Sequence, residues 1–268
     1  IYSNKIEQLA SIFANKNKSF EDLKLGYLKP SSTCNNIDEE VICSVIRILG
    51  SRRRIMGIPT KFPRDDKFPQ QAKDYVFMKK VLCFGDSNTY GFIPQSGLRY
   101  DKNTRWTGIL QSLCRNELEV IEAGCNNRTA FIDNPAGIEQ TGYKILPKYL
   151  KAEYFDIIIL AIGVNDLQLF FRPTLEKFEQ GIEKLIKITK DLSPNAKIIL
   201  VCPSKLDLAG IKSGVFSFQF DEISVEKSYH LPQIYKKLAE KHACKLVDLN
   251  EIAKVSPLDG LHFSAESH

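Results

Sequence analysis

The sequence lacks any apolar run long enough to cross a membrane. A spanning helix needs roughly 18 or more consecutive apolar residues, and no stretch of the 268 residues reaches that length. Residues Ile1–Lys5 also lack the charged and then apolar layout of a signal peptide. The chain does not begin with Met, so this second absence describes only the residues given. We therefore expect no membrane span and no classical secretion signal.

Paired cysteines and metal-ligand clusters are also absent. The seven cysteines are an odd number without a Cys-x-x-Cys pair, and no His, Cys and acidic cluster has a recognisable metal spacing. Cys83, Cys125 and Cys202 lie in or beside expected strands, where a free thiol packs as a small apolar group. We expect a reduced, cytoplasmic protein with no metal and no cofactor. Secretion by a route without a classical signal stays open.

A large basic face is missing as well. The net charge of +5 is modest for this length, whereas nucleic-acid binding usually needs clustered positive charge. Arg52, Arg53 and Arg54 form a short basic run, which a solvated helix end explains more simply than a phosphate or anionic-lipid patch. With 43% hydrophobic and 26% charged residues, the composition is that of an ordinary globular protein. We expect no nucleic-acid partner; a homo-oligomer is left open.

From Lys80 onward, short apolar runs alternate with amphipathic segments. The strand candidates are Lys80–Phe84, Leu118–Ile121, Phe155–Ile162, Lys197–Cys202 and Lys245–Leu249. Between them, residues 106–113, 175–186 and 234–239 carry apolar side chains at helical spacing. Largely apolar strands joined by amphipathic helices specify a parallel sheet covered on both faces. The fold class is therefore α/β, with five parallel strands.

Chemically useful residues follow these strands. Ser87 stands just after the first strand, near an expected helix N-terminus whose N–H groups can receive an anion. Gly124 and Asn165 follow the next two strands, so all three should gather at one edge of the sheet. Asp259 and His262 are three residues apart near the end. Ser87 alone would read as a helix cap, but four ordered blocks are a more specific signal.

These blocks resemble the SGNH hydrolases, also called the GDSL esterase/lipase family. The four signature residues of that family are matched by Ser87, Gly124, Asn165 and His262. The resemblance runs from Met78 to the end of the chain. It looks closest to the bacterial arylesterase-like branch, which Arg105-Trp106 and Gly163–Leu167 also resemble. It implies a flavodoxin-like three-layer α/β/α sandwich.

The resemblance also implies a role for each residue. Ser87 would be the nucleophile and His262 the base, while Asp259 would orient the imidazole by accepting its other ring N–H. The oxyanion donors would be the backbone N–H groups of Ser87 and Gly124 and the side-chain amide of Asn165. A side chain at Gly124 would crowd the substrate carbonyl. The remaining histidines are interpreted as structural or solvent-facing: His230, His242 and His268.

The expected reaction is hydrolysis of small carboxylic esters, with short acyl or aryl groups, through an acyl-enzyme. A thioesterase for acyl-CoA, a carbohydrate deacetylase and an acyltransferase share this chemistry and stay open. The alternative from another class is a catalytically weak hydrolase-fold binding or scaffold protein, docked to a partner through its N-terminal segment. Intact Ser87, Asp259 and His262 favour the enzyme, with a small-molecule ester as its partner.

Two expected loops, Gly91–Thr104 and Leu206–Tyr229, carry aromatic residues close to the active edge. These are Phe92, Tyr100, Phe216, Phe218 and Phe220. They would either wall a pocket for an acyl or aryl group or form a small satellite core beneath the loops. The sequence favours neither interpretation.

The chain departs from the family pattern at three positions. Asn88 stands where the motif's name expects Leu, a position that varies and leaves the chemistry intact. Tyr90 stands where arylesterase-like members often carry Trp, which puts the size of the acyl pocket in doubt. The given sequence stops at His268, six residues after His262, where relatives continue into a helix that would brace the His loop and cover one sheet face.

Residues 1–77 are expected to be a mainly helical N-terminal addition to a hydrolase domain over residues 78–268. Ile6, Leu9, Ile12 and Phe13 fall at helical spacing, and Val41–Leu49 is a second apolar cluster. The function of this addition cannot be inferred from its residues.

We predict that residues 1–77 are structurally coupled to the hydrolase domain. One of their apolar faces would take the place of the final helix, and its burial should stabilise the domain by several kcal/mol, at roughly 25 cal/mol per Å². A chain beginning at Met78 should then melt at a lower temperature and turn over ester more slowly than the full chain. Pro59, Pro63 and Pro69 support the competing view of a flexible linker. Equal melting temperature and equal kcat would establish that view.

Overall fold

The computed structural model describes residues 78–115 and 117–268. Its centre is a parallel sheet with the strand order β2-β1-β3-β4-β5. The strands are β1 (Lys79–Gly85), β2 (Leu118–Gly124), β3 (Ile157–Ala161), β4 (Lys197–Cys202) and β5 (Lys245–Asp248). The predicted five-stranded parallel sheet is confirmed, and each strand lies within a few residues of its predicted position.

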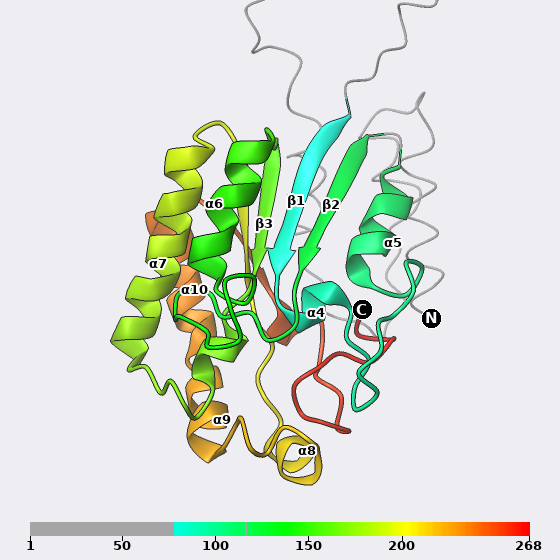
Figure 1. The fold of residues 1–268 in the computed structure, drawn as a ribbon, viewed down its shortest axis with the longest axis vertical. Coiled ribbons are helices and arrows are strands. Elements are labelled where there is room, and N and C mark those ends of the chain that lie inside the picture. The colour runs from blue at the N-terminus through cyan, green and yellow to red at the C-terminus, as the bar shows by residue number, and fades with distance from the viewer. Residues whose placement is uncertain (1–77, 116) are drawn as a thin grey trace, which may run out of the picture.

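Helices cover both faces of this sheet, as Figure 1 shows. The helices are α4 (Ser87–Tyr90), α5 (Trp106–Leu113), α6 (Gly142–Ala152), α7 (Leu175–Leu192), α8 (Leu208–Ser213), α9 (Glu222–Ser228) and α10 (Leu231–Lys241), with the 3₁₀ turns η2 (Val164–Leu167) and η3 (Leu249–Glu251). Apolar side chains of α6, α7 and α10 pack on one face, and those of α5 pack on the other. The predicted α/β/α sandwich is therefore confirmed.

Alternation along the strands explains the two cores. On β1, Leu82 and Phe84 belong to the core beneath α6, α7 and α10, whereas Val81 and Cys83 belong to the core beneath α5. Successive side chains of a strand point to opposite faces, so a strand covered on both faces must be apolar throughout. The buried thiol of Cys83 thus packs as a small apolar group, as expected.

The predicted loop over residues 206–229 is wrong in part, because it contains α8 and α9. Each helix begins at an aspartate whose carboxylate caps it: Asp207 accepts from the Gly210 N–H, and Asp221 accepts from the Ser224 N–H. Helices of six and seven residues are too short to show a clear 3.6-residue period, which is why the apolar pattern missed them. The apolar pattern of the sequence does not predict α6 either. This helix carries Pro147 in its interior.

The predictions made for residues 1–77, including their helices, their coupling and the domain boundary at residue 78, lie outside the described residues. Within the described part of the chain, no helix combines the length and the apolarity needed to cross a membrane.

Gly124, at the end of β2, lies directly against the backbone of α4. A Cβ atom built on Gly124 would lie 2.2 Å from the Tyr90 backbone nitrogen and 2.5 Å from the Thr89 carbonyl carbon. Because backbone cannot move aside as a flexible side chain can, only glycine fits under α4 without displacing it. This packing constraint is distinct from the substrate crowding inferred from the sequence.

We predict that Gly124→Ala lowers the free energy of unfolding by more than the roughly 1–3 kcal/mol of ordinary overpacking, because the clash is with backbone. Urea unfolding measures this loss. Gly97→Ala is the matched control: nothing lies within 4 Å of a Cβ there, so only the strain of its left-handed backbone, about 1–2 kcal/mol, should appear. Equal losses in the two variants would contradict the packing argument.

Candidate active site

Ser87 lies in a tight turn at the carboxyl end of β1, the central strand of the three formed by β2, β1 and β3 (Figure 1). Asp86 caps α4 by accepting a hydrogen bond from the Asn88 N–H at 3.0 Å. Gly91, with φ of 87°, ends the helix, and its N–H donates to the Ser87 carbonyl at 2.9 Å. This short turn fixes the Ser87 backbone immediately beyond the sheet edge.

The side chains of Ser87, His262 and Asp259 form a continuous hydrogen-bonded chain. Ser87 Oγ lies 2.9 Å from His262 Nε2, and His262 Nδ1 lies 2.9 Å from Asp259 Oδ2. Because an ionised carboxylate only accepts hydrogen bonds, Nδ1 must carry the proton and Nε2 is free to accept from the serine hydroxyl. All three side chains are buried, with at most 4% of each residue exposed.

The Asp259 carboxylate is held in its charged form. Burial by itself would raise its pKa, but hydrogen bonds and the charge of His262, with a further backbone bond from Leu261, hold that pKa below its ordinary value. Asp259 Oδ1 accepts from the backbone N–H groups of Leu261 at 3.1 Å and His262 at 2.9 Å. The carboxylate therefore fixes both the ring and the backbone of His262.

Gly124 and Asn165 lie at the ends of the two strands that flank β1. Gly124 pairs with Gly85 in the register of β1 and β2, and Asn165 lies in η2, which follows β3. Asn165 donates from Nδ2 to the Arg128 carbonyl at 3.1 Å, which uses one of its two amide hydrogens. The sheet thus gathers the three strand-end positions predicted from the sequence at one edge.

Gln168 orients the Asn165 amide, a role that the sequence did not reveal. Its Nε2 donates to Asn165 Oδ1 at 3.0 Å and to Asn127 Oδ1 at 2.7 Å. Because Oδ1 receives a donor, the NH₂ end of Asn165 must face the other way, towards Arg128 and the sheet edge. The spacing of three residues between Asn165 and Gln168 within one turn is the only sequence signal that could have indicated this pair.

Arg128 is fully buried and ties the ends of β1 and β2 together. Its Nη1 donates to the carbonyls of Gly85 and Ala123, and its Nε donates to the Glu139 carbonyl at 2.8 Å. Its guanidinium also lies 4.6 Å from the centre of the Phe84 ring. A buried charge requires such partners, and the bonds to Gly85 and Ala123 join the two strand ends next to Gly124.

Two buried aspartates act as acceptors for backbone N–H groups. Burial raises the pKa of Asp86 to about 7, although its bond from Asn88 and the nearby Arg128 charge lower it. Burial likewise raises the pKa of Asp166 to about 7 against the effect of its backbone donors. Those donors are Ala130, Phe131 and Ile132. Asp166 thereby holds the segment that follows Arg128 against η2.

The aromatic residues divide between the two roles considered from the sequence. The rings of Phe92 and Phe216 lie 4.3 Å and 5.0 Å from the His262 ring, centre to centre, and 6.1 Å from each other, so they adjoin the imidazole as neighbours. Phe220 is buried in the main core, and Phe218 is exposed. Each of the two interpretations left open from the sequence therefore holds for part of the set: Phe92 and Phe216 adjoin the site, and Phe220 belongs to the core.

The other histidines lie apart from the Ser87 hydroxyl. His242 pairs with Glu183 at 3.0 Å, and His230 is exposed at the start of α10. The His268 ring packs against Tyr100 and Phe263, at 5.1 Å and 5.7 Å between centres. Burial and the nearby His262 lower the pKa of His268 to about 4. These positions agree with the structural or solvent-facing interpretation.

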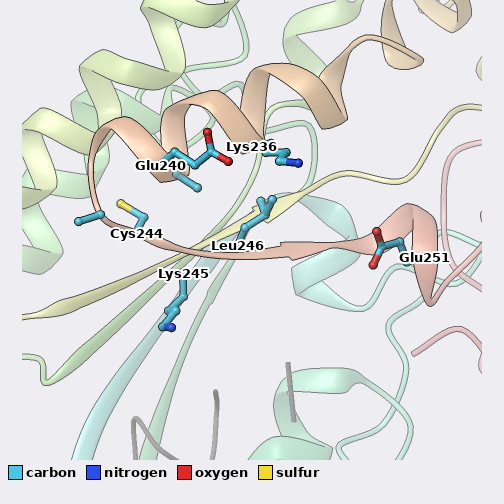
Figure 2. A pocket seen from close by; sticks show the side chains of 8 residues that line it. Lys236, Glu240, Cys244, Lys245, Leu246 and Glu251 are labelled. Carbon is cyan, nitrogen blue, oxygen red and sulfur yellow. The ribbon is translucent and has the colours of Figure 1, made fainter. Parts of the chain in front are cut away.

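A pocket of about 530 Å³ lies away from this chain of residues, between α10 and β5. Figure 2 shows its lining side chains, among them Lys236, Glu240 and Cys244. None of the lining residues belongs to the hydrogen-bonded set of Ser87, His262 and Asp259.

Within residues 78–115 and 117–268, no group of three or more His, Cys, Asp or Glu side chains could hold a metal ion.

Comparison with known proteins agrees with this geometry. Residues 83–268 match the GDSL-like Lipase/Acylhydrolase family. No curated protein matches the chain. Among solved structures, Est24, a carbohydrate acetylesterase from Sinorhizobium meliloti, is 30% identical with a TM-score of 0.66, covering 70% of this chain and 92% of its own. The native M. smegmatis aryl esterase is 29% identical with a TM-score of 0.64, covering 70% and 91%.

A carbohydrate acetylesterase family member from Sinorhizobium meliloti is 31% identical, with a TM-score of 0.65, and covers 71% of this chain and 92% of its own. The matched region contains the whole sheet edge on which Ser87, Gly124, Asn165 and His262 lie. The chain therefore belongs to the GDSL-like lipase/acylhydrolase family, as an arylesterase-like SGNH esterase.

Proposed function

We propose that this esterase hydrolyses small carboxylic esters, with short acyl or aryl groups, through an acyl-enzyme formed on Ser87. The observation that carries the proposal is the hydrogen-bonded chain from Ser87 Oγ through the His262 ring to Asp259, with 2.9 Å at each step. A nucleophile bonded to a base, which is itself oriented by a carboxylate, is the arrangement that covalent ester cleavage needs.

In the proposed first half-reaction, Ser87 Oγ attacks the ester carbonyl carbon while its proton passes to His262 Nε2. The charge on the carbonyl oxygen is stabilised by the backbone N–H groups of Ser87 and Gly124 and by the second amide hydrogen of Asn165. The charged Asp259 stabilises the imidazolium. His262 then gives its proton to the leaving alcohol, and Ser87 is left acylated.

In the second half-reaction, water takes the place of the alcohol. His262 accepts a proton from the water as its oxygen attacks the acyl carbon, and returns the proton to Ser87 Oγ as the acid leaves. Both halves use the same donors, because both pass through an oxyanion at the same position. The buried, pre-bonded site lets these groups act without rearrangement.

The substrate class is proposed from the rings that adjoin His262 and from the similar structures. Phe92 and Phe216 offer apolar surface beside the base, which suits a short acyl or aryl group. The likeness to a carbohydrate acetylesterase favours acetylated sugars as a second candidate class. A panel of p-nitrophenyl esters of increasing acyl length, compared with acetylated sugars, measures both preferences as kcat/KM.

The scaffold alternative predicts a different outcome with a fluorophosphonate probe. Covalent labelling of Ser87 needs an activated serine and supports the enzyme, whereas a correctly folded chain that is not labelled supports a binding protein.

We further propose that residues 78–268 form the hydrolase domain and that the protein works in the cytoplasm. The described cysteines are all free thiols, as a reducing compartment favours.

Ser87→Ala should abolish ester turnover and leave the fold intact. Removing the nucleophile of such a triad typically lowers kcat by a factor on the order of 10⁶. Ester turnover and thermal melting measure the two effects, and Ser193→Ala at the end of α7, outside the sheet edge, is the matched control. Residual kcat within about tenfold of wild type would show that Ser87 is not the nucleophile.

Asn165→Ala should lower kcat by roughly 10²–10³, the usual effect of losing one oxyanion donor. KM should change little, because the amide acts mainly on the charge that develops in the transition state. Steady-state kinetics separate the two constants. Asn250→Ala removes an amide of the same type that bonds Pro203 and Lys205 and should leave kcat unchanged. An effect confined to KM would assign Asn165 to ground-state binding.

A further inference from the structure

Asn88, the residue after Ser87, holds the loop that carries His262. We propose that Asn88 is a positioning residue, which fixes His262 relative to Ser87 through the backbone on both sides of the histidine. This inference rests on the proposed function, because it concerns the alignment of the same nucleophile and base. By the sequence alone, Asn at this position is a variation without consequence for the chemistry.

The two ends of the Asn88 amide contact the two neighbours of His262. Oδ1 accepts from the Phe263 N–H at 3.0 Å, and Nδ2 donates to the Leu261 carbonyl at 3.2 Å. The side-chain amide thus offers this loop one donor and one acceptor, as the backbone of a neighbouring strand would. His262 is therefore clamped at the residue before it and the residue after it, by a side chain adjacent to Ser87.

Other contacts hold the same loop to different parts of the molecule. The Ser256 N–H donates to the His262 carbonyl at 2.7 Å, and the Asp207 N–H donates to the Gly260 carbonyl at 3.0 Å. These bonds keep the loop folded and join it to the start of α8. Asn88, by contrast, joins the loop to α4, where Ser87 lies. Without Asn88 the loop should remain folded but could shift relative to the nucleophile.

Asp259 and Asn88 hold His262 in different ways. Asp259 bonds the His262 ring and the N–H groups of Leu261 and His262, so it sets the tautomer and orientation of the imidazole within its own loop. In the part of the chain that the structure describes, Asp259 forms no hydrogen bond with α4. Asn88 supplies that link, and the link sets the distance between Ser87 Oγ and His262 Nε2.

Proton transfer is sensitive to this distance. A misplacement of about 1 Å between reacting groups can cost on the order of 10²-fold in rate. Loss of Asn88 should therefore lower kcat by roughly 10- to 100-fold, with KM changed by less than about threefold, since the groups that contact bound ester would remain. The rate at which a fluorophosphonate labels Ser87 should fall by a similar factor, because it depends on the same base.

The test compares Asn88→Ala with Asn250→Ala in the full chain. Asn250 is a matched control, since its amide also clamps a loop from both ends: Oδ1 accepts from the Lys205 N–H at 2.7 Å, and Nδ2 donates to the Pro203 carbonyl at 3.1 Å. Asn88→Leu is the second variant, with a similar shape but no polar atoms. Kinetics are measured well below each melting temperature, with wild type and Ser87→Ala in parallel.

The expected result is the stated loss of kcat and labelling rate in both Asn88 variants, with Asn250→Ala within about twofold of wild type. A kcat within about twofold of wild type in a folded Asn88 variant, or an equal loss in Asn250→Ala, would overturn the proposal. Unfolding of both Asn88 variants would also overturn it, by making Asn88 a requirement of the fold. Active Ser87→Ala, in contrast, would refute the proposed function itself.

Discussion

The parallel order of the sheet is the constraint on which the site depends. Parallel strands place all their carboxyl ends at one edge, and β1 lies between β2 and β3. Ser87 follows β1, Gly124 ends β2 and Asn165 follows β3, so the sheet register brings residues far apart in the sequence to adjacent positions. His262, 175 residues from Ser87, reaches the same edge through the loop after η3.

Burial of so many polar groups at this edge is stable only because nearly all of them are bonded. An unpaired buried polar group costs about 1–3 kcal/mol, and the Asp259 carboxylate avoids that cost by accepting three hydrogen bonds. Arg128 and Asp166 are satisfied in the same way by backbone groups. The same network makes the site rigid, which is what electrostatic stabilisation of a transition state requires.

The residues around the proposed catalytic groups have separate tasks. Asp259 orients the His262 ring, while Asn88 bonds its backbone neighbours. Gln168 orients the Asn165 amide, while Arg128 joins the ends of β1 and β2 next to Gly124. Phe92 and Phe216 add apolar surface beside the imidazole. These contacts give the carboxyl end of the sheet a buried site of fixed geometry.

The sequence by itself determined the fold class, the strand positions and the residues proposed for catalysis. These are encoded locally: apolar runs give the strands, amphipathic spacing gives α5, α7 and α10, and the candidate residues stand directly after strands. The helices α8 and α9 do not follow from the apolar pattern, because they depend on the single capping residues Asp207 and Asp221 more than on any period.

Only the tertiary structure decided which side chains touch. Asn88 finds its partners 173 and 175 residues away, and Phe220 enters the core while Phe216 from the same segment reaches His262. The need for glycine at position 124 likewise arises from α4 lying against β2. Such contacts depend on how elements distant in sequence pack in space, and a local pattern of residue types carries no record of that distance.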